Sequence, residues 1–261
     1  MTWRTHSCVP CRDSSRHQSA DYDAHRPGRF FPDASSPLTV AQAYEVQRRN
    51  ADLRVARGEA IAGYKIGCLS RAVQRQLGID QPVFGHLFTS ELHRSGVSLD
   101  SAAFENLAIE GEFGIRIAED VPDPDWLVRH PERAIAEVLA VIELHNNVFR
   151  GATPTAAELI ANNALHAGVV LPAGQGSRQL DDRITVFRNG EQIGMQTAGA
   201  IPGGLFASLL SIATHLALSG RFLRRGELVL TGSPLPLYPV GPGDSISVCT
   251  AHCGEVSATV L

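Results

Sequence analysis

Lysine is almost absent from this sequence. Lys65 is the single lysine among 23 basic residues, and all the others are arginines. The formal net charge at pH 7 is −4, and no stretch of the chain gathers arginines into a basic stripe. Because binding to a nucleic-acid backbone depends on clustered positive charge, this composition argues against a nucleic-acid partner.

Long hydrophobic runs are also missing. The longest apolar block, residues 205–218, is interrupted by serine, threonine and histidine and falls short of the roughly 18 residues that a membrane span needs. It is better interpreted as a core helix. No uninterrupted apolar segment stands near the N-terminus, so we expect neither a membrane span nor a secretory signal.

The cysteines are few and follow no framework pattern. Five of them are scattered along the chain, and an odd number without a signal peptide favours a reduced cytoplasm over a disulfide scaffold. Cys8 and Cys11 have CxxC spacing, but the surrounding segment has no apolar pattern that would fold around zinc, so a disordered tail is favoured. The chain also lacks a G-x-S-x-G elbow and a P-loop, which excludes the standard serine hydrolases and nucleotide enzymes.

The hydrophobic pattern predicts one domain preceded by a polar extension. Residues 1–36 are rich in Arg, Ser, His and Asp, a composition that predicts a disordered or loosely attached segment. Residues 37–261 contain no repeat and no linker, so we expect a single domain there. Thr39 and Ser70 are predicted helix N-caps, and Asn189-Gly190 predicts a tight hairpin. Strands dominate without a βαβ rhythm, which indicates the α+β class.

Three glutamates are the first candidates for chemistry. Residues 109–117 alternate as in a strand, so Glu110 and Glu112 share one face about 7 Å apart. Glu143 ends the apolar run 138–142. Carboxylates on one face repel unless something positive lies between them, and a hard divalent cation such as Mg²⁺ or Mn²⁺ takes oxygen ligands of this kind. The alternative is a solvated strand face on which Glu112 pairs with Arg116.

The lone lysine is the next candidate. Lys65 lies between Gly63 and Gly67, and glycines let a ligand or another backbone approach closely. Lysine carries a compact charge on a flexible stem, and burial readily lowers its pKa, which arginine cannot match. We therefore interpret Lys65 as functional, either as a proton carrier or as an anchor for an anion.

These motifs together resemble the 2-hydroxypentadienoate (2-keto-4-pentenoate) hydratase family. That family belongs to the fumarylacetoacetate hydrolase superfamily and also includes 4-oxalocrotonate decarboxylases. The similar stretches occur in the family's order over roughly residues 38–261, at positions 63–85, 109–113, 141–143, 229–233 and 241–244. The resemblance implies a mixed, strongly curved β-sheet roll with peripheral helices, and a small 2-oxo or 2-hydroxydienoic acid from aromatic-ring degradation as substrate.

The resemblance also implies roles for individual residues. Glu110, Glu112 and Glu143 match the carboxylate ligands of a Mg²⁺ or Mn²⁺ ion, and Lys65 matches the family's active-site lysine. The metal would stabilise the enolate formed on proton removal, and a desolvated Lys65 with a lowered pKa would move that proton. Asn163 is expected to line the substrate pocket or simply to end a helix. Ser233 is expected to bind the substrate or to form a plain turn.

The chain departs from the family pattern at two places. Val83 stands where the family usually carries an aspartate, which puts water addition in question. After Glu143 the sequence reads Leu-His-Asn-Asn-Val instead of a form such as Val-Asp-Ser-Arg. His145 is a candidate for the missing acid–base function, and the alternative is a hydrogen-bonded histidine at a strand end.

The leading hypothesis is a cytoplasmic, metal-dependent lyase, most simply a hydratase, that forms a homo-oligomer. A 2-oxo acid decarboxylase of the 4-oxalocrotonate type and a C–C bond hydrolase are alternatives within the same chemistry. A non-catalytic metal-binding subunit that associates with a pathway aldolase or decarboxylase is an alternative from another class. A structural protein that binds no metal is a third possibility.

Overall fold

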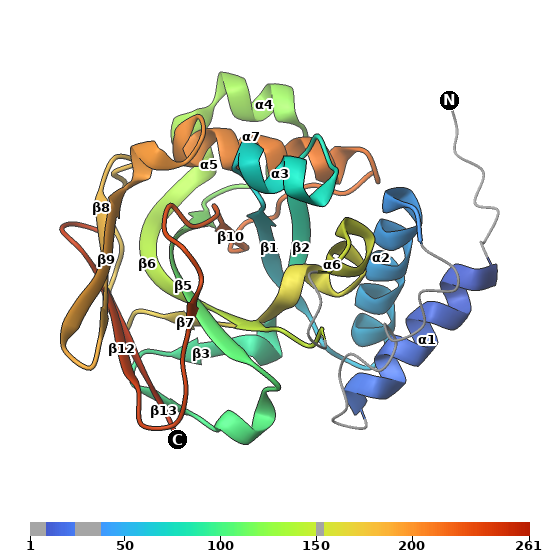
Figure 1. Ribbon diagram of the computed structural model, residues 1–261. Helices are drawn as coiled ribbons and strands as arrows, with labels where there is room; N and C mark the ends of the chain where they lie inside the picture. Colours follow the sequence, from blue (N-terminus) through green and yellow to red (C-terminus); the bar gives the residue numbers. More distant parts are fainter. Residues whose placement is uncertain (1–8, 24–37, 150–153) are drawn as a thin grey trace.

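Two β-sheets and the helices around them make up the fold (Figure 1). The computed structural model describes residues 9–23, 38–149 and 154–261. Within these ranges, no helix has the length and apolar character that crossing a membrane requires. The predicted α+β class is confirmed.

The large sheet is mixed. Its order is β2-β1-β10-β5-β6-β7-β3, with β11 paired to β5 outside this path. The β1–β10 and β3–β7 pairs are parallel and the remaining pairs antiparallel. Its strands are β1 (Ile61–Gly67), β2 (Val83–Phe88), β3 (Leu92–Arg94), β5 (Leu107–Ile117), β6 (Ile135–Asn146), β7 (His166–Leu171), β10 (Leu228–Leu230) and β11 (Tyr238–Pro239).

The small sheet has the order β4-β13-β12-β8-β9. The β8–β9 hairpin turns at Asn189 and Gly190, which both have positive φ, 54° and 79°, as the predicted primed turn requires. The strands of this sheet are β4 (Val97–Leu99), β8 (Arg183–Arg188), β9 (Glu191–Thr197), β12 (Ser245–Thr250) and β13 (Glu255–Val260).

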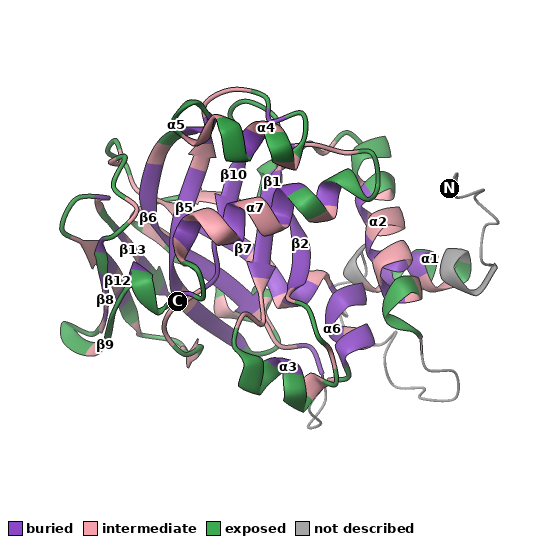
Figure 2. Cartoon of the chain, turned by 90° about the horizontal axis from the view of Figure 1, so that it is seen from above, coloured by how far each residue is buried: buried purple, intermediate pink, exposed green. Residues whose placement is uncertain are grey.

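The helices lie outside the sheets. Thr39 caps α2 through a capping box and Ser70 caps α3, as predicted. Figure 2 shows strands of the large sheet buried while α3 and α4 are mostly exposed. The α-helices are α1 (Val9–Asp23), α2 (Val40–Ala56), α3 (Arg71–Leu77), α4 (Pro124–Arg129), α5 (Pro131–Ala134), α6 (Ala156–Ala161) and α7 (Gly204–Ala217). The 3₁₀ turns are η1 (Thr89–Glu91), η2 (Ser101–Ala103), η3 (Asn163–Leu165) and η4 (Ala198–Ala200).

The two faces of β5 have different surroundings. On the odd-numbered face, Gly111 lies so close to the small sheet that an added Cβ would sit 2.7 Å from Val186. On the even-numbered face, apolar side chains from strands that are not neighbours pack together: Leu87, Leu139, Val141, Val169, Leu228 and Leu230. Contacts across non-adjacent strands require the sheet to curl with this face inside, so the expected curved roll is confirmed.

Part of the expected N-terminal extension is a helix. The segment Val9–Asp23, expected to be part of a loose extension, is helix α1 and packs against α2. The composition argument counts apolar surface, whereas α1 is attached through polar contacts such as Gln18 Nε2 donating to the Ala161 carbonyl at 2.9 Å. Farther along the chain, the short helix α5 ends at Ala134, because Ile135 already pairs with β5.

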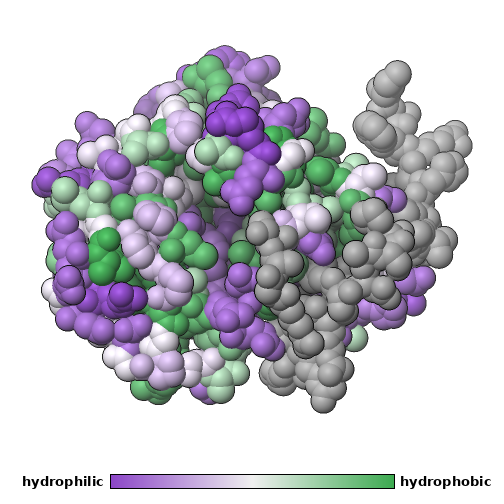
Figure 3. Space-filling view, viewed as in Figure 1, coloured by the Kyte–Doolittle hydropathy of each residue, from purple (hydrophilic) through white to green (hydrophobic). Residues whose placement is uncertain are grey.

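The remainder of the expected extension, residues 1–8 and 24–36, lies outside the described residues, and so does Cys8 of the CxxC pair. On the side of the molecule seen in Figure 3, hydrophilic and hydrophobic side chains are interspersed, and the residues coloured there form no large continuous apolar area.

Candidate active site

A group of titratable side chains gathers inside the curl of the large sheet. Strand register explains why they share one face. Glu110 of β5 stands opposite Glu143 of β6, and Lys65 of β1 stands opposite Leu230, which in turn pairs with Gly114. Alternation along each strand then adds the remaining members. The group is Lys65, Glu110, Glu112, Glu143 and His145, with His166 from β7.

Lys65 is buried among carboxylates. Its side chain is 2% exposed, and Nζ lies 2.7 Å from Glu143 Oε1. Nζ also donates to the Ala164 carbonyl at 3.1 Å. Burial lowers the pKa of Lys65, but the charges of Glu143, Glu112 and Glu110 outweigh burial and raise the pKa above its ordinary value. The lowered pKa was expected for a lysine beside a bound cation; with the three carboxylates alone around it, the pKa of Lys65 is raised and its side chain is a cation.

A left-handed turn presents the Ala164 carbonyl to Lys65. Asn163, Ala164 and Leu165 have φ values of 56°, 55° and 62°, a conformation that costs non-glycine residues roughly 1–2 kcal/mol each. The turn is fixed to β2 by the Asn163 amide, whose Nδ2 donates to the His86 carbonyl and whose Oδ1 accepts from the His86 N–H, both at 2.8 Å. Both polar atoms of the Asn163 side chain are thus used to orient the turn behind Lys65.

Glu143 is fully buried, and its two carboxylate oxygens have different surroundings. Its Oε1 lies 2.7 Å from Lys65 Nζ and 2.6 Å from His166 Nδ1. Its Oε2 has no hydrogen-bond partner. Burial raises the pKa of Glu143, but Lys65 and His145 outweigh burial and hold the pKa well below its ordinary value. The carboxylate is therefore charged, with one oxygen left for a further ligand.

Glu112 is buried rather than solvated. The whole residue is 1% exposed, and its Oε2 accepts a hydrogen bond from the Gly232 N–H at 3.1 Å. Burial, followed by the charges of Glu143 and Glu110, raises its pKa well above the ordinary value. Arg116, its partner in the alternative interpretation, pairs instead with Glu137 at 3.1 Å. The solvated-face interpretation is therefore wrong.

Glu110, Glu143 and His145 form the donor group best placed for a metal. Each offers one ligand atom, and these atoms lie within 4.8 Å of one another. Glu143 Oε2 and His145 Nε2 are both buried and lie 3.3 Å apart without meeting the geometry of a hydrogen bond, and the two carboxylates of the group suit a divalent cation. Glu110, with 22% of its side chain exposed, is where the group meets solvent. Glu112 is not part of this group.

Burial lowers the pKa of His145, but the charge of Glu143 outweighs burial and raises the pKa to about 8. His145 is the last residue but one of β6, and its Nε2 faces the carboxylates of Glu110 and Glu143 at 3.2 Å and 3.3 Å.

His166 is a further member of this group that the sequence motifs do not single out. Its Nδ1 lies 2.6 Å from Glu143 Oε1, and its Nε2 lies 3.6 Å from Glu91 Oε2. His166 is the first residue of β7, and β7 pairs with β6, the strand that carries Glu143.

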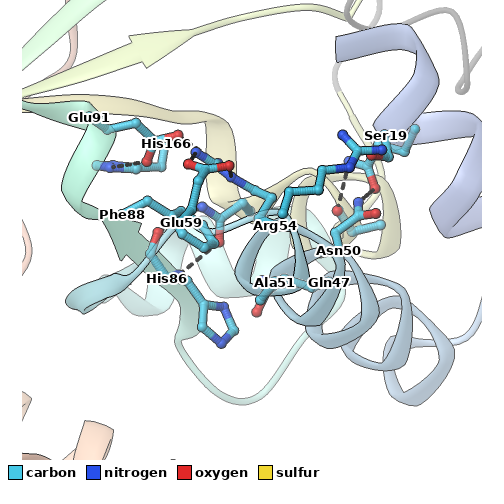
Figure 4. Close-up of a pocket in the computed structure, with 14 residues that line it drawn as sticks. Ser19, Gln47, Asn50, Ala51, Arg54, Glu59, His86, Phe88, Glu91 and His166 are labelled. Atoms are coloured by element: carbon cyan, nitrogen blue, oxygen red, sulfur yellow. Dashed lines mark hydrogen bonds and ion pairs between the residues drawn. The ribbon is translucent and has the colours of Figure 1, made fainter. Parts of the chain in front are cut away.

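Behind His166 lies a cavity of about 220 Å³ (Figure 4). Its wall comes from α1, α2 and β2, and Arg54 crosses it to pair with Glu59 and Glu91, each at 2.6 Å. His166 thus separates this cavity from the carboxylate group.

Ser233 and Val83 are the two remaining positions that the sequence analysis singled out, and both make contacts within the fold. Ser233 Oγ donates to the Gly111 carbonyl at 3.0 Å and accepts from the Leu235 N–H at 3.1 Å, which forms a turn beside Glu112. Val83 is fully buried in an apolar cluster with Val46 and Ile160. The position of the family's aspartate therefore lies in an apolar environment in this chain.

Comparisons with known proteins agree with this geometry. No family model matches the chain. A 2-keto-4-pentenoate hydratase from Burkholderia vietnamiensis is 31% identical over 225 residues, covering 83% of this chain and 84% of the relative. A 4-oxalocrotonate decarboxylase from Pseudomonas putida is 24% identical, covering 91% and 90%.

Solved structures extend the comparison to the fold. A 4-oxalocrotonate decarboxylase from Pseudomonas putida G7, complexed with magnesium and adipate, superposes with a TM-score of 0.87 at 24% identity, over 99% of this chain and 100% of that one. A fumarylpyruvate hydrolase from Pseudomonas aeruginosa, in complex with Mn²⁺ and pyruvate, gives 0.57 at 15% identity, over 76% and 88%.

The curled mixed sheet is similar in fold to these solved structures. At 31% identity over 83% of its length, the chain belongs to the 2-keto-4-pentenoate hydratase family. It is accordingly an enzyme of the lyase type, and its donor group suits a divalent metal.

Proposed function

We propose that the protein is a divalent-metal-dependent hydratase of a small 2-hydroxydienoic acid such as 2-hydroxypenta-2,4-dienoate. The observation that carries this proposal is the buried group of Lys65, Glu110 and Glu143 in a chain 31% identical to a 2-keto-4-pentenoate hydratase. The reaction adds water across the terminal double bond and yields 4-hydroxy-2-oxopentanoate. The proposal includes a homo-oligomer that acts in the cytoplasm. The thiols of Cys68, Cys249 and Cys253 are free, and free thiols are typical of a reducing compartment.

The proposed cation is Mg²⁺ or Mn²⁺, held by Glu110 and Glu143 with Glu112 beside them. When bound, it supplies Lewis-acid stabilisation of the enolate of a 2-oxo acid. Burial and the charges of Glu143 and Glu110 raise the pKa of Glu112, and a cation bound beside it would favour its charged form. Glu110 is the ligand at the solvent side, where substrate enters.

Lys65 is the proposed acid–base or anchoring group. Its ammonium holds a proton at Nζ, fixed between Glu143 Oε1 and the Ala164 carbonyl. From that position it gives its proton to the substrate skeleton or binds the substrate carboxylate. The Asn163 turn and the curl of the sheet exclude water from Nζ, which strengthens either interaction. Ser233 and Asn163 support the pocket through backbone contacts.

Decarboxylation of a 4-oxalocrotonate-type substrate is the second candidate. Val83, buried among apolar side chains, supplies no polar group for activating water, and loss of CO₂ needs none. Both reactions begin from the same stabilised enolate, so the same ligands and Lys65 serve either one.

The experiment is a pair of product assays with Mn²⁺ or Mg²⁺ and with a chelator. Formation of 4-hydroxy-2-oxopentanoate from 2-hydroxypenta-2,4-dienoate, followed by NMR and lost with the chelator, is the expected result. Release of CO₂ from 4-oxalocrotonate without hydration would assign the decarboxylase, and cleavage of an acylpyruvate would assign a hydrolase. Metal binding without turnover of any of them would indicate the non-catalytic subunit instead.

A further inference from the structure

Two buried glutamines from different helices hold the C-terminal end of α6. Gln18 of α1 and Gln47 of α2 are 3% and 4% exposed. Gln18 Nε2 donates a hydrogen bond to the Ala161 carbonyl at 2.9 Å. Gln47 Nε2 donates to the preceding carbonyl, that of Ile160, at 2.8 Å. Because carbonyls in the last turn of a helix lack partners within that helix, the two side-chain amides supply the bonds that this short helix cannot make itself.

The two glutamines are themselves fixed in place by further hydrogen bonds. Gln18 Oε1 accepts from Asn50 Nδ2 of α2, and Gln47 Nε2 also donates to the Phe84 carbonyl of β2, at 2.8 Å. Helix α2 packs against both α1 and α6 and lies between them (Figure 1). The end of α6 is therefore tied to α1, α2 and β2 through buried side-chain amides.

The segment that follows α6 leads directly to Lys65. Residues 163–165 have the left-handed conformation, and a strained turn of this kind persists only where its surroundings hold it. The Ala164 carbonyl in this turn accepts a hydrogen bond from Lys65 Nζ at 3.1 Å. Since Ala161 lies only a few residues before Ala164, a shift at the end of α6 moves this carbonyl relative to the Lys65 ammonium.

We propose that Gln18 is a positioning residue for the reaction, because its hydrogen bond to Ala161 holds the turn that keeps the Ala164 carbonyl at Lys65. This inference rests on the proposed function, in which Lys65 is the acid–base or anchoring group. The bonding partners of Gln18 lie outside the carboxylate group, so its effect passes through the turn. Helix α1, which the composition predicted to be loosely attached, is then part of the catalytic assembly.

The test is steady-state kinetics of Gln18→Met, which keeps the length of the side chain and removes its hydrogen bonds. We expect kcat to fall by about three- to tenfold, the scale of one hydrogen bond, while KM changes little because Gln18 lies outside the substrate pocket. Thr250→Val is the matched control. The Thr250 hydroxyl also makes two hydrogen bonds, to the Gly254 carbonyl and the Cys253 N–H, but in the small sheet. Its loss should leave kcat unchanged.

Two further readouts separate positioning from a general loss of structure. The double variant Gln18→Met with Asn163→Ala should lose less kcat than the product of the two single losses, because both substitutions release the same turn. Hydrogen–deuterium exchange of backbone amides, followed by mass spectrometry, should quicken over residues 160–166 in Gln18→Met and keep wild-type rates in the small sheet. This second readout requires no substrate.

The outcomes separate this inference from the proposed function. Wild-type kcat in folded Gln18→Met, losses that multiply in the double variant, or exchange that quickens equally along the chain would overturn the role of Gln18 and leave the proposed function intact. A wild-type protein that turns over none of the proposed substrates would overturn both. If Gln18→Met fails to fold, Asn50→Ala decides, because it removes the bond that orients Gln18. A smaller fall in kcat is expected there, and wild-type kcat would likewise overturn the inference.

Discussion

Lys65 and Glu143 form a buried ion pair at 2.7 Å although their strands are not neighbours. The strands β10 and β5 lie between β1 and β6 in the sheet. In a flat sheet, three strand spacings would separate the two backbones by about 14 Å. The curl of the sheet and the length of the two side chains close that gap, so the fold itself creates the contact on which the site depends.

Breaking this pair should destabilise the protein strongly when no metal is present. Lys65→Met removes the nearest positive charge from the buried Glu143 carboxylate, and we expect the free energy of unfolding to fall by about 3–5 kcal/mol. Urea unfolding in EDTA measures the loss. Arg116→Met is the matched control, because the Arg116–Glu137 pair is partly exposed, with 32% and 24% of the side chains accessible, and its loss should cost about 0–1 kcal/mol. Equal losses in the two variants would contradict a special role for the buried pair.

Lys65→Arg tests the chemistry separately from the charge. Arginine keeps the positive charge but cannot give up a proton, and its planar fork does not fit the space between Glu143 and the Ala164 carbonyl. We expect turnover to fall on the order of 10²–10⁴-fold, as for loss of a general acid–base group. Steady-state kinetics, with circular dichroism to confirm folding, provide the measurement. Near-normal turnover would remove Lys65 from the proton path.

The Asn163 turn should affect turnover more than stability. Asn163→Ala removes two hydrogen bonds to His86 and so releases the Ala164 carbonyl from its position at Lys65. We expect kcat to fall by about tenfold or more with a smaller change in KM. Asn189→Ala is the matched control, since Asn189 also has a positive φ, 54°, and makes two hydrogen bonds, to Asp244 and Ser245, in the small sheet. A similar loss of kcat in both variants would show that the effect is not specific to the turn.

Buried His86 should make the protein less stable as the pH falls. Burial, then the nearby charge of Arg221, lowers its pKa to about 3, against 6.5 for a free histidine. The unfolded chain therefore takes up a proton below pH 6.5 that the folded state refuses until about pH 3. The stability contributed by neutral His86 is complete above pH 6.5 and declines across that window by up to about 1.4 kcal/mol per pH unit.

The His86 effect is measured as the difference in unfolding free energy between wild type and His86→Gln at several pH values. The difference should shrink on acidification between pH 6.5 and pH 3 as the wild type loses this advantage. His252→Gln, at a histidine with 55% of its side chain exposed, is the control for replacing a histidine at the surface. Parallel curves for wild type and His86→Gln would contradict a neutral buried ring.

Local rules were enough to locate part of this architecture from the sequence. Thr39 and Ser70 cap helices because a side-chain oxygen satisfies a free N–H one turn on, and this depends only on nearby residues. Glu110 and Glu112 share a face because strand alternation has a period of two. The apolar run 138–142 placed Glu143 at the end of a strand, and the family resemblance added its link to Glu110 and the curved roll, which no local rule contains.

Features that depend on distant contacts could not be derived in this way. The raised pKa of Lys65 arises from carboxylates on β5 and β6, which the curl brings to β1. The left-handed turn at Asn163 exists because the His86 backbone, far away in the sequence, holds it. Helix α1 was missed because polar contacts such as that of Gln18 attach it, and composition does not register them.

The central claim is that this site removes and returns a proton next to a 2-oxo acid with the help of a divalent cation. Proton–deuterium exchange at C3 of 2-oxopentanoate tests it most directly, because this compound enolises but is neither hydrated nor decarboxylated. The account predicts exchange with Mn²⁺ or Mg²⁺ that disappears with a chelator and in Glu143→Gln. No exchange by folded, metal-loaded wild-type protein, or exchange that survives the chelator, would contradict it.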